Sequence, residues 1–549
     1  MLTMQIARKL INQKYFHSFA FIFLIILWLP MAIYGFHPHH EGLMLATLNL
    51  TAEALRSGAP LPFNQYGHLW ALPYLSLELL SLDGFTFLAQ RLLSIVMIFL
   101  SALMLYRLSL AFQSKRTSLY ITYFFLLSYP YGQPSIIWPS VPAQLALIVL
   151  AFSIIKATET KRQVYLFLAG FSTVYLIGSR VQIGLVALIC TIVILSFTKQ
   201  FRCLLHYIIS ISLIFTFLLV ALIKLEYLKD VFFDSFIFPL TYLDNNSANW
   251  TFPKSSIVFA IALFLLYFSL SSFVHTKNIL NLAAVLYTLI LLSFFTIQLL
   301  EVSLFLKLYA RTFVGLFFIT IIVVIIALIQ ELRCTRFTIS SKGILFVYSL
   351  IGAIQIFPLF DVFHAWYASV PAIVALPLVV KSTKLYLNVN RNFIVVGLTS
   401  FMVTMTTIFT LQFLHTISAD SAPFPQSGIQ GLRLSTQQAK DLTREFDFLQ
   451  NNIPKGSQVL NLCSNANPFF ERGYLSTAHR YFIYWASLPE NTLRKVDLSQ
   501  IDYVTTCNTT DFSQKEISEL ITSHFTKIET RSENSFWGVS WEIYKNNSK

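Results

Sequence analysis

The chain is a series of long apolar stretches separated by short polar loops. Compared with the roughly 20 apolar residues that cross the hydrocarbon core of a bilayer, these stretches predict about 13 transmembrane helices. The predicted spans are 18–35, 86–106, 117–130, 138–155, 163–178, 182–197, 205–224, 255–274, 279–299, 311–330, 343–357, 369–380 and 393–415. We therefore expect a polytopic α-helical membrane protein.

Lys and Arg residues gather in every second loop between the predicted spans. Arg8, Lys9 and Lys14 precede the first span, and basic residues also follow each even-numbered span. Because cytoplasmic loops are enriched in Lys and Arg, this pattern predicts a cytoplasmic N-terminus and an extracytoplasmic C-terminus. It also argues against nucleic acid as a partner, although the formal net charge is +13. No small-residue cleavage site follows the first span, so we expect an uncleaved anchor.

Composition agrees with this class, since 56% of the residues are hydrophobic and only 12% are charged. The predicted organisation is a membrane domain at 1–415, a linker at 416–435 and a small extracytoplasmic α/β domain at 436–549. In the last domain we expect helices at 436–451 and 514–523, and strands at 458–462, 501–506 and 537–544, the final one alternating like an edge strand. Its two cysteines, Cys463 and Cys507, form the predicted disulfide because disulfides persist in oxidising compartments.

The first external loop, 36–85, concentrates ionisable side chains directly after a span. They are His37, His39, His40 and Glu41. Ionisable groups at a membrane edge are costly unless they serve a site or face water, so both a functional and a solvated-loop interpretation remain open. The next stretch, 43–57, carries apolar residues at spacings of three and four and predicts an amphipathic helix along the membrane surface, or a helix that packs between spans.

Further polar candidates lie in other predicted external loops. Arg180 separates two apolar spans, and its guanidinium carries a fork of donors suited to phosphate, unless it is a purely interfacial arginine. Asp361 and His364 are spaced i, i+3 and would share a helix face, either in a site or in a structural hydrogen bond. Lys307 and Arg311 belong to another external charged group.

These motifs resemble the GT-C superfamily of integral-membrane glycosyltransferases, which place a catalytic Asp or Glu in the first external loop. The matching stretches are His39-His40-Glu41-Gly42 with Gln65-Tyr66-Gly67, then Gly178-Ser179-Arg180-Val181-Gln182, and residues 357–364. Many members have Asp, or an Asp-Glu pair, where this chain has the single Glu41. The resemblance implies a GT-C-like fold and sugar transfer from a polyprenyl-phosphate donor to a glycan, lipid or protein acceptor. It also implies location in a bacterial inner membrane, among membrane lipids.

The chemistry of such a transfer suggests a role for each candidate. Glu41 is the expected general base for the acceptor hydroxyl, and cations must stabilise the leaving phosphate. The candidates for binding the donor phosphate are Arg180, Arg311, Lys307, His39 and His40. Supporting residues are Gln182, Asp361, His364, Gln65 and Tyr66.

A cofactor and the reaction class stay open at this level. A divalent metal would assist the leaving phosphate, and its candidate ligands are His37, His39, His40 and Glu41. Four residues so close in sequence do not easily reach one ion. The alternative functions are a transporter or flippase of lipid-linked glycans and a ligase that moves another lipid-linked group. The chain shows no internal repeat of the kind that many transporters carry.

Overall fold

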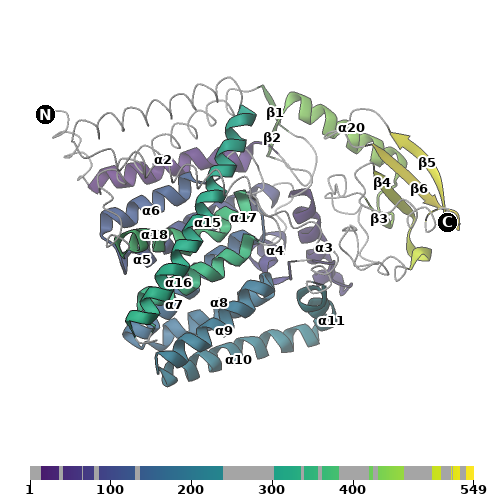
Figure 1. The fold of residues 1–549 in the computed structure, drawn as a ribbon. Coiled ribbons are helices and arrows are strands. Elements are labelled where there is room, and N and C mark those ends of the chain that lie inside the picture. Colours follow the sequence, from purple (N-terminus) through teal and green to yellow (C-terminus); the bar gives the residue numbers. More distant parts are fainter. Residues whose placement is uncertain are drawn as a thin grey trace.

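The protein is mostly helical, with a bundle of long helices at one end and a small sheet at the other (Figure 1). The computed structural model describes residues 14–35, 41–64, 66–79, 86–129, 137–238, 302–335, 339–356, 362–382, 420–423, 431–462, 497–507, 521, 523–531 and 540–548. The predicted spans at 255–274, 279–299 and 393–415 lie outside these residues.

The bundle is built from the apolar stretches of the sequence. Its longer helices are α2 (Lys14–Ile33), α5 (Thr86–Leu110), α6 (Lys115–Leu127), α7 (Ser140–Thr160), α8 (Gln163–Ser179), α9 (Val181–Phe197), α10 (Phe201–Lys224), α15 (Val302–Cys334), α16 (Ser341–Ala353) and α18 (Val370–Ser382). Every predicted span within the described residues overlaps one of these helices. In that part of the chain, α5, α7, α10 and α15 are long and apolar enough to cross a membrane. The total of about 13 spans stays a prediction.

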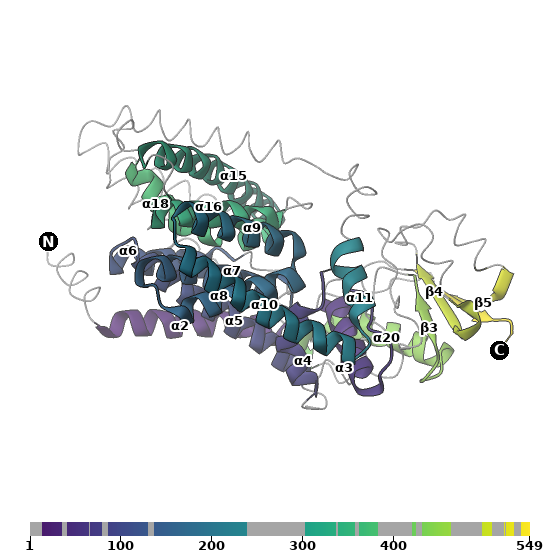
Figure 2. The ribbon, with the colours of Figure 1, turned by 90° about the horizontal axis from the view of Figure 1, so that it is seen from below.

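Short elements at one end of the bundle connect the long helices. They are α3 (Leu43–Ser57), η2 (Leu69–Ala71), α4 (Leu72–Leu79), α11 (Leu228–Phe232), the π-helical turn η3 (Phe233–Ile237), η5 (Ile354–Ile356) and α17 (Val362–Ala368). Figure 2 shows α11 beside α3, and the Tyr227 hydroxyl donates a hydrogen bond to the Ala54 carbonyl at 2.7 Å. Segments far apart in the sequence therefore meet at this end.

The helix predicted at 43–57 has the predicted bounds but not a simple surface position. It ends at Gly58, which adopts a left-handed conformation with φ 73° and donates to Ala54. Its side chains from Leu43 to Leu48 are all buried, so the first part of α3 is covered on all sides. Of the two interpretations of the sequence pattern, packing between spans fits this burial, because α4 and the 225–238 segment cover the helix.

The C-terminal region forms the sheet at the far end of the molecule. Its strands β3 (Val459–Asn461), β4 (Tyr503–Cys507), β6 (Trp541–Asn546) and β5 (Phe525–Arg531) lie in that order, with β3–β4 parallel and the other pairs antiparallel. A short turn, η9 (Leu498–Gln500), precedes β4. Helix α20 (Thr436–Asn452) packs on the sheet, where Trp541 Nε1 donates to the buried Glu445 carboxylate at 2.5 Å.

One strand prediction was wrong in its position. The stretch expected as an edge strand at 537–544 corresponds to β6, which lies between β4 and β5. The edge beside it is β5, which the sequence analysis did not predict. Alternation of apolar and polar residues reports that one face of a strand is buried, whereas edge position depends on which strands pair with it. The helix expected at 514–523 falls mostly outside the described residues.

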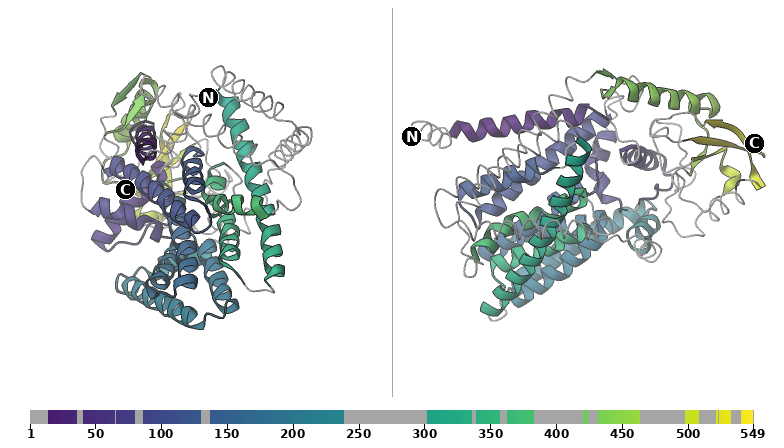
Figure 3. Two further views of the ribbon diagram at one scale, coloured as in Figure 1. Left: turned by 90° about the vertical axis from the view of Figure 1, so that its left-hand side faces the viewer. Right: turned by 45° about the horizontal axis from the view of Figure 1, so that its top comes forward.

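In the described part of the chain, two contacts join the sheet region to the bundle. Near the end of α2, the Gly35 N–H donates to the carbonyl of Arg433 in β2 (Arg433–Ser435), which pairs with β1 (Ser421–Pro423). A second contact is an apolar cluster that joins Phe63 of the first loop and Phe238 to the sheet residues Leu460 and Val504. Figure 3 shows the sheet and α20 extending from one end of the bundle.

The structure describes one of the two cysteines of the predicted disulfide. Cys507 is disulfide-bonded, whereas Cys190, Cys203 and Cys334 are free. Cys463 lies outside the described residues, so the Cys463–Cys507 pairing stays a prediction.

Candidate active site

Glu41 is one half of a fully buried ion pair. Its carboxylate lies in the turn before α3, and the guanidinium of Arg91 reaches it from α5. Arg91 Nη2 lies 2.5 Å from Glu41 Oε2, and Arg91 Nε donates to Oε1 at 3.0 Å. Both side chains are 0% exposed. This two-point geometry is the strong form of an arginine–carboxylate contact.

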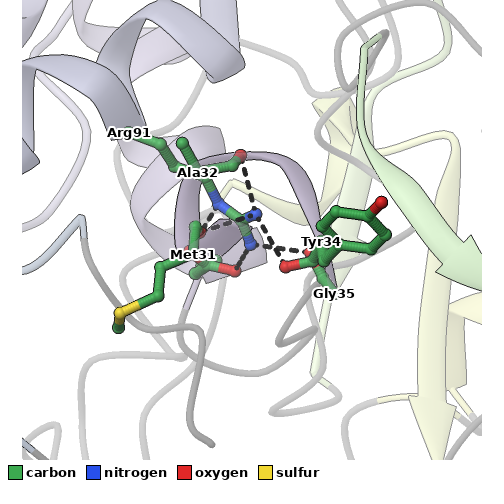
Figure 4. A network of polar contacts seen from close by, with 6 residues as sticks. Met31, Ala32, Tyr34, Gly35 and Arg91 are labelled. Carbon is green, nitrogen blue, oxygen red and sulfur yellow. Dashed lines mark hydrogen bonds and ion pairs between the residues drawn. The ribbon is translucent and has the colours of Figure 1, made fainter. Parts of the chain in front are cut away.

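The same arginine also organises the backbone around it. Its Nη1 and Nη2 atoms donate at 2.8–3.5 Å to the carbonyls of Met31, Ala32, Tyr34 and Gly35. Figure 4 shows the guanidinium surrounded by the backbone of residues 31–35. Carbonyls at the end of a helix lack partners within the helix, so Arg91 caps α2 and fixes the start of the first loop.

The pairing bears on the role predicted for Glu41. Both carboxylate oxygens accept hydrogen bonds from Arg91, so proton uptake by Glu41 would require this contact to loosen. Its role as general base stays a prediction. The sequence analysis did not assign a partner to Glu41, although an arginine inside an apolar span is itself a signal of a buried partner.

Arg180 lies in a different setting and is partly buried. It is the single residue between α8 and α9, with φ −152° and ψ 79°. Its Nη2 donates to Ser140 Oγ at 2.5 Å, and its Cζ lies 4.6 Å from the centroid of the Tyr66 ring. Among the described residues, none forms a hydrogen bond with its buried Nε atom. In the described part of the chain, no carboxylate forms an ion pair with Arg180.

Aromatic residues lie near both arginines, with Tyr129 close to Arg91 and Tyr367 close to Arg180. The ring centroids of Tyr129 and Tyr367 lie 4.9 Å and 5.1 Å from that of Trp366. Burial raises the pKa of the Tyr367 hydroxyl, and the neighbouring Arg180 cation opposes that rise. Tyr367 therefore belongs to the surroundings of Arg180.

A histidine–aspartate pair lies beside these residues and was not predicted. His68 Nε2 is 2.8 Å from Oδ2 of Asp234 in η3, and the same oxygen accepts the Asn64 backbone N–H at 3.0 Å. Asp234 is 0% exposed. His68 falls in the predicted first external loop and Asp234 falls between the predicted spans 205–224 and 255–274, but nothing in their spacing indicates that they meet.

Gly67 connects the His68–Asp234 contact to the contact between Tyr66 and Arg180. It lies between Tyr66 and His68 with φ +85°, and a side chain there would collide with the Gly178 carbonyl of α8. A glycine is needed because the backbones approach closely and φ is positive. Residues 66–68 are therefore clamped to the end of α8.

The other predicted site residues divide into three groups. His37, His39, His40, Gln65 and Asp361 lie outside the described residues, and so does most of the candidate metal site. Lys307 lies on α15, where its side chain is not described, and Arg311 is exposed on the same helix. Gln182 is exposed on α9, whereas His364 is buried on α17. Of the predicted residues, the structure brings Tyr66 together with Arg180.

Comparisons with known proteins find a likeness of structure. No protein-family model matches the chain, and no curated protein matches it. Among solved structures, it is similar to the apo crystal structure of ArnT from Cupriavidus metallidurans, with a TM-score of 0.43 and 12% identity over 96% of this chain and 98% of that one. ArnT is a GT-C glycosyltransferase, the superfamily that the sequence motifs resemble. A likeness with a TM-score of 0.43 assigns neither substrate nor catalytic residues to this chain.

Proposed function

We propose that this protein is a membrane glycosyltransferase of the GT-C type. In this proposal it transfers a sugar from a polyprenyl-phosphate donor to an extracytoplasmic glycan, lipid or protein acceptor. The observation that carries the proposal is Arg180, a partly buried cation with a fully buried Nε atom and no carboxylate partner in the described part of the chain. Burying an uncompensated charge is costly, so this position calls for an anionic ligand.

The contrast with Arg91 sharpens this inference. Arg91 has a carboxylate and several carbonyls around it, so its donors are used within the protein. Arg180 has a hydroxyl and an aromatic ring instead, and its buried Nε–H has no hydrogen-bond partner within the described residues. A guanidinium with free donors matches the geometry of a phosphate group.

The surroundings fit a donor with a lipid tail. Large apolar side chains are exposed on the helices that flank Arg180, including Phe171 on α8 and Ile189 on α9, which are 52% and 60% exposed. Exposed apolar surface on a bundle of this kind is typical of helices that face lipid. A polyprenyl chain would lie along such surface while its phosphate reaches Arg180.

The proposed reaction is a displacement at the anomeric carbon of the donor sugar. The acceptor hydroxyl oxygen bonds to this carbon, the bond to the phosphate oxygen breaks, and the hydroxyl proton passes to a base. Arg180 stabilises the negative charge that develops on the leaving polyprenyl phosphate. Glu41 is the base that the sequence predicts, and Arg91 would have to release it during the reaction.

Binding and transfer measurements with the full chain in lipid nanodiscs test the proposal. Undecaprenyl phosphate should bind, and a panel of undecaprenyl-phosphate sugars should include one that is consumed. Arg180→Ala should weaken undecaprenyl phosphate binding roughly 10- to 100-fold, because charged hydrogen bonds contribute about 1.5–3 kcal/mol. Arg107→Ala, which changes an exposed arginine in the last turn of α5, is the matched control.

Three outcomes would contradict this function. Equal binding by wild type and Arg180→Ala would remove Arg180 from the donor site. Movement of intact lipid-linked glycans across liposome membranes, without sugar transfer, would favour a flippase. Transfer of a group other than a single sugar would favour the ligase alternative.

A further inference from the structure

The His68 ring has one nitrogen that is occupied and one that is not. Nε2 lies 2.8 Å from the Asp234 carboxylate, and it donates to this carboxylate in the neutral imidazole. In that tautomer Nδ1 carries the lone pair. Nδ1 is buried without a hydrogen-bond partner in the described part of the chain, and the side chain is only 9% exposed. The ring therefore presents an unused acceptor.

A purely structural role explains the contact of Nε2 with Asp234 but not the state of Nδ1. The His68–Asp234 pair joins the first loop to η3, and a hydroxyl or amide could make the same connection. It does not account for a buried ring nitrogen left without a donor, since buried polar atoms nearly always have partners. A histidine oriented by a carboxylate, with its second nitrogen free, is the arrangement that general-base catalysis uses.

We propose that His68, oriented by Asp234, is the general base of the transfer reaction; this inference rests on the proposed function. The acceptor hydroxyl gives its proton to Nδ1 of His68 as its oxygen bonds to the anomeric carbon. The bond between that carbon and the donor phosphate oxygen breaks, and polyprenyl phosphate leaves. The imidazolium is stabilised by Asp234 and returns its proton to water after the product departs.

The position of His68 relative to Arg180 supports this role. The Tyr66 ring contacts the Arg180 guanidinium. His68 is two residues further along the chain than Tyr66, so the α-carbons of Tyr66 and His68 are at most about 7.6 Å apart. Gly67 fastens this short segment to the Gly178 carbonyl. The proposed base and the proposed phosphate ligand are thereby held in one fixed unit.

Glu41 takes a different part in this scheme. Its two oxygens hold Arg91, which in turn holds the backbone at the end of α2. Glu41 then acts as a positioning residue that orders the first loop, whereas Nδ1 of His68 accepts no hydrogen bond from any described residue. The two assignments predict opposite outcomes for matched variants.

The decisive variant is His68→Gln. A glutamine amide keeps an N–H that can reach Asp234, but it has no basic nitrogen. We expect kcat with the consumed undecaprenyl-phosphate sugar to fall about 10²- to 10⁴-fold, with undecaprenyl phosphate binding unchanged. His206→Ala, which alters a histidine on α10 that contacts Gln163, is the control and should transfer at the wild-type rate.

Chemical rescue separates a base from a structural contact. His68→Ala leaves space for a free imidazole, so added imidazole should restore part of the lost kcat in this variant and not in Asp234→Asn. Asp234→Asn should lower kcat strongly, because its amide can turn the ring to the wrong tautomer. A structural role alone predicts no rescue by imidazole.

The possible failures are distinguishable. If wild-type protein transfers no sugar from any donor in the panel, the proposed function fails and this inference fails with it. If wild type and His68→Gln transfer at similar rates while Glu41→Gln does not, only the inference fails and Glu41 is the base. Loss of activity in His68→Ala without imidazole rescue, together with normal His68→Gln activity, would also overturn it.

Discussion

Replacing Glu41 by Gln should destabilise the protein whatever its catalytic role. The substitution keeps the shape of the side chain but removes the charge that compensates Arg91. Both partners are 0% exposed, so the remaining guanidinium cannot recover the loss by contact with water. Breaking a buried pair in this way typically costs about 3–5 kcal/mol of unfolding free energy.

The local structure sets where in this range the effect should fall. Arg91 keeps its hydrogen bonds to the carbonyls of Met31, Ala32, Tyr34 and Gly35, which carry part of the compensation. The new amide oxygen can also accept one bond from Arg91. We therefore expect a loss of about 3 kcal/mol, at the lower end of the range.

The assay is reversible denaturant unfolding of the detergent-solubilised protein, followed by tryptophan fluorescence. Glu53→Gln is the matched control, because Glu53 is exposed on α3 and its substitution should stay within about 0.5 kcal/mol of wild type. A double-mutant cycle with Arg91→Met completes the test. The double variant Glu41→Gln/Arg91→Met should cost less than the sum of its single variants, by about 0.5–3 kcal/mol.

Two results would refute this reasoning. An unfolding free energy for Glu41→Gln close to that of wild type would mean that the pair is not buried as described. Strict additivity in the cycle would mean that Glu41 and Arg91 do not interact. Because stability changes, transfer by Glu41→Gln must be expressed per folded protein before it is compared with transfer by His68→Gln.

Three further predictions address the link between site, sheet and membrane. Gly67→Ala should abolish transfer and destabilise by about 1–3 kcal/mol, because φ is positive and the new methyl meets the Gly178 carbonyl; thermal unfolding and activity measure both. Phe63→Ala should cost about 3–5 kcal/mol and expose the C-terminal sheet to limited proteolysis, and unchanged cleavage would count against the apolar contact. A non-reducing peptide map should contain Cys463 linked to Cys507, and a C-terminal alkaline phosphatase fusion should be active if that end is extracytoplasmic.

Local patterns in the sequence determined much of the helical framework. Apolar length predicted the bundle helices, and the spacing of apolar residues with a terminal glycine predicted α3 at Leu43–Ser57. The helix at Thr436–Asn452 and the strands β3 and β4 were predicted for the same reason. These features depend on residues within a few positions of one another, where helix and strand periodicity is visible. Strand order, by contrast, depends on pairing between distant segments, and so the position of β6 was wrong.

The sequence also singled out Glu41, Tyr66 and Arg180, because charged and polar groups beside apolar spans stand out against their surroundings. Only the tertiary structure decided what each of them contacts. Arg91 meets Glu41 from 50 residues away, and His68 meets Asp234 from 166 residues away. The local sequence does not tell which residue is the partner, because the energy of such pairs comes from burial and geometry that arise only when the helices pack. The chemistry of the site therefore depends on contacts that periodicity and composition do not encode.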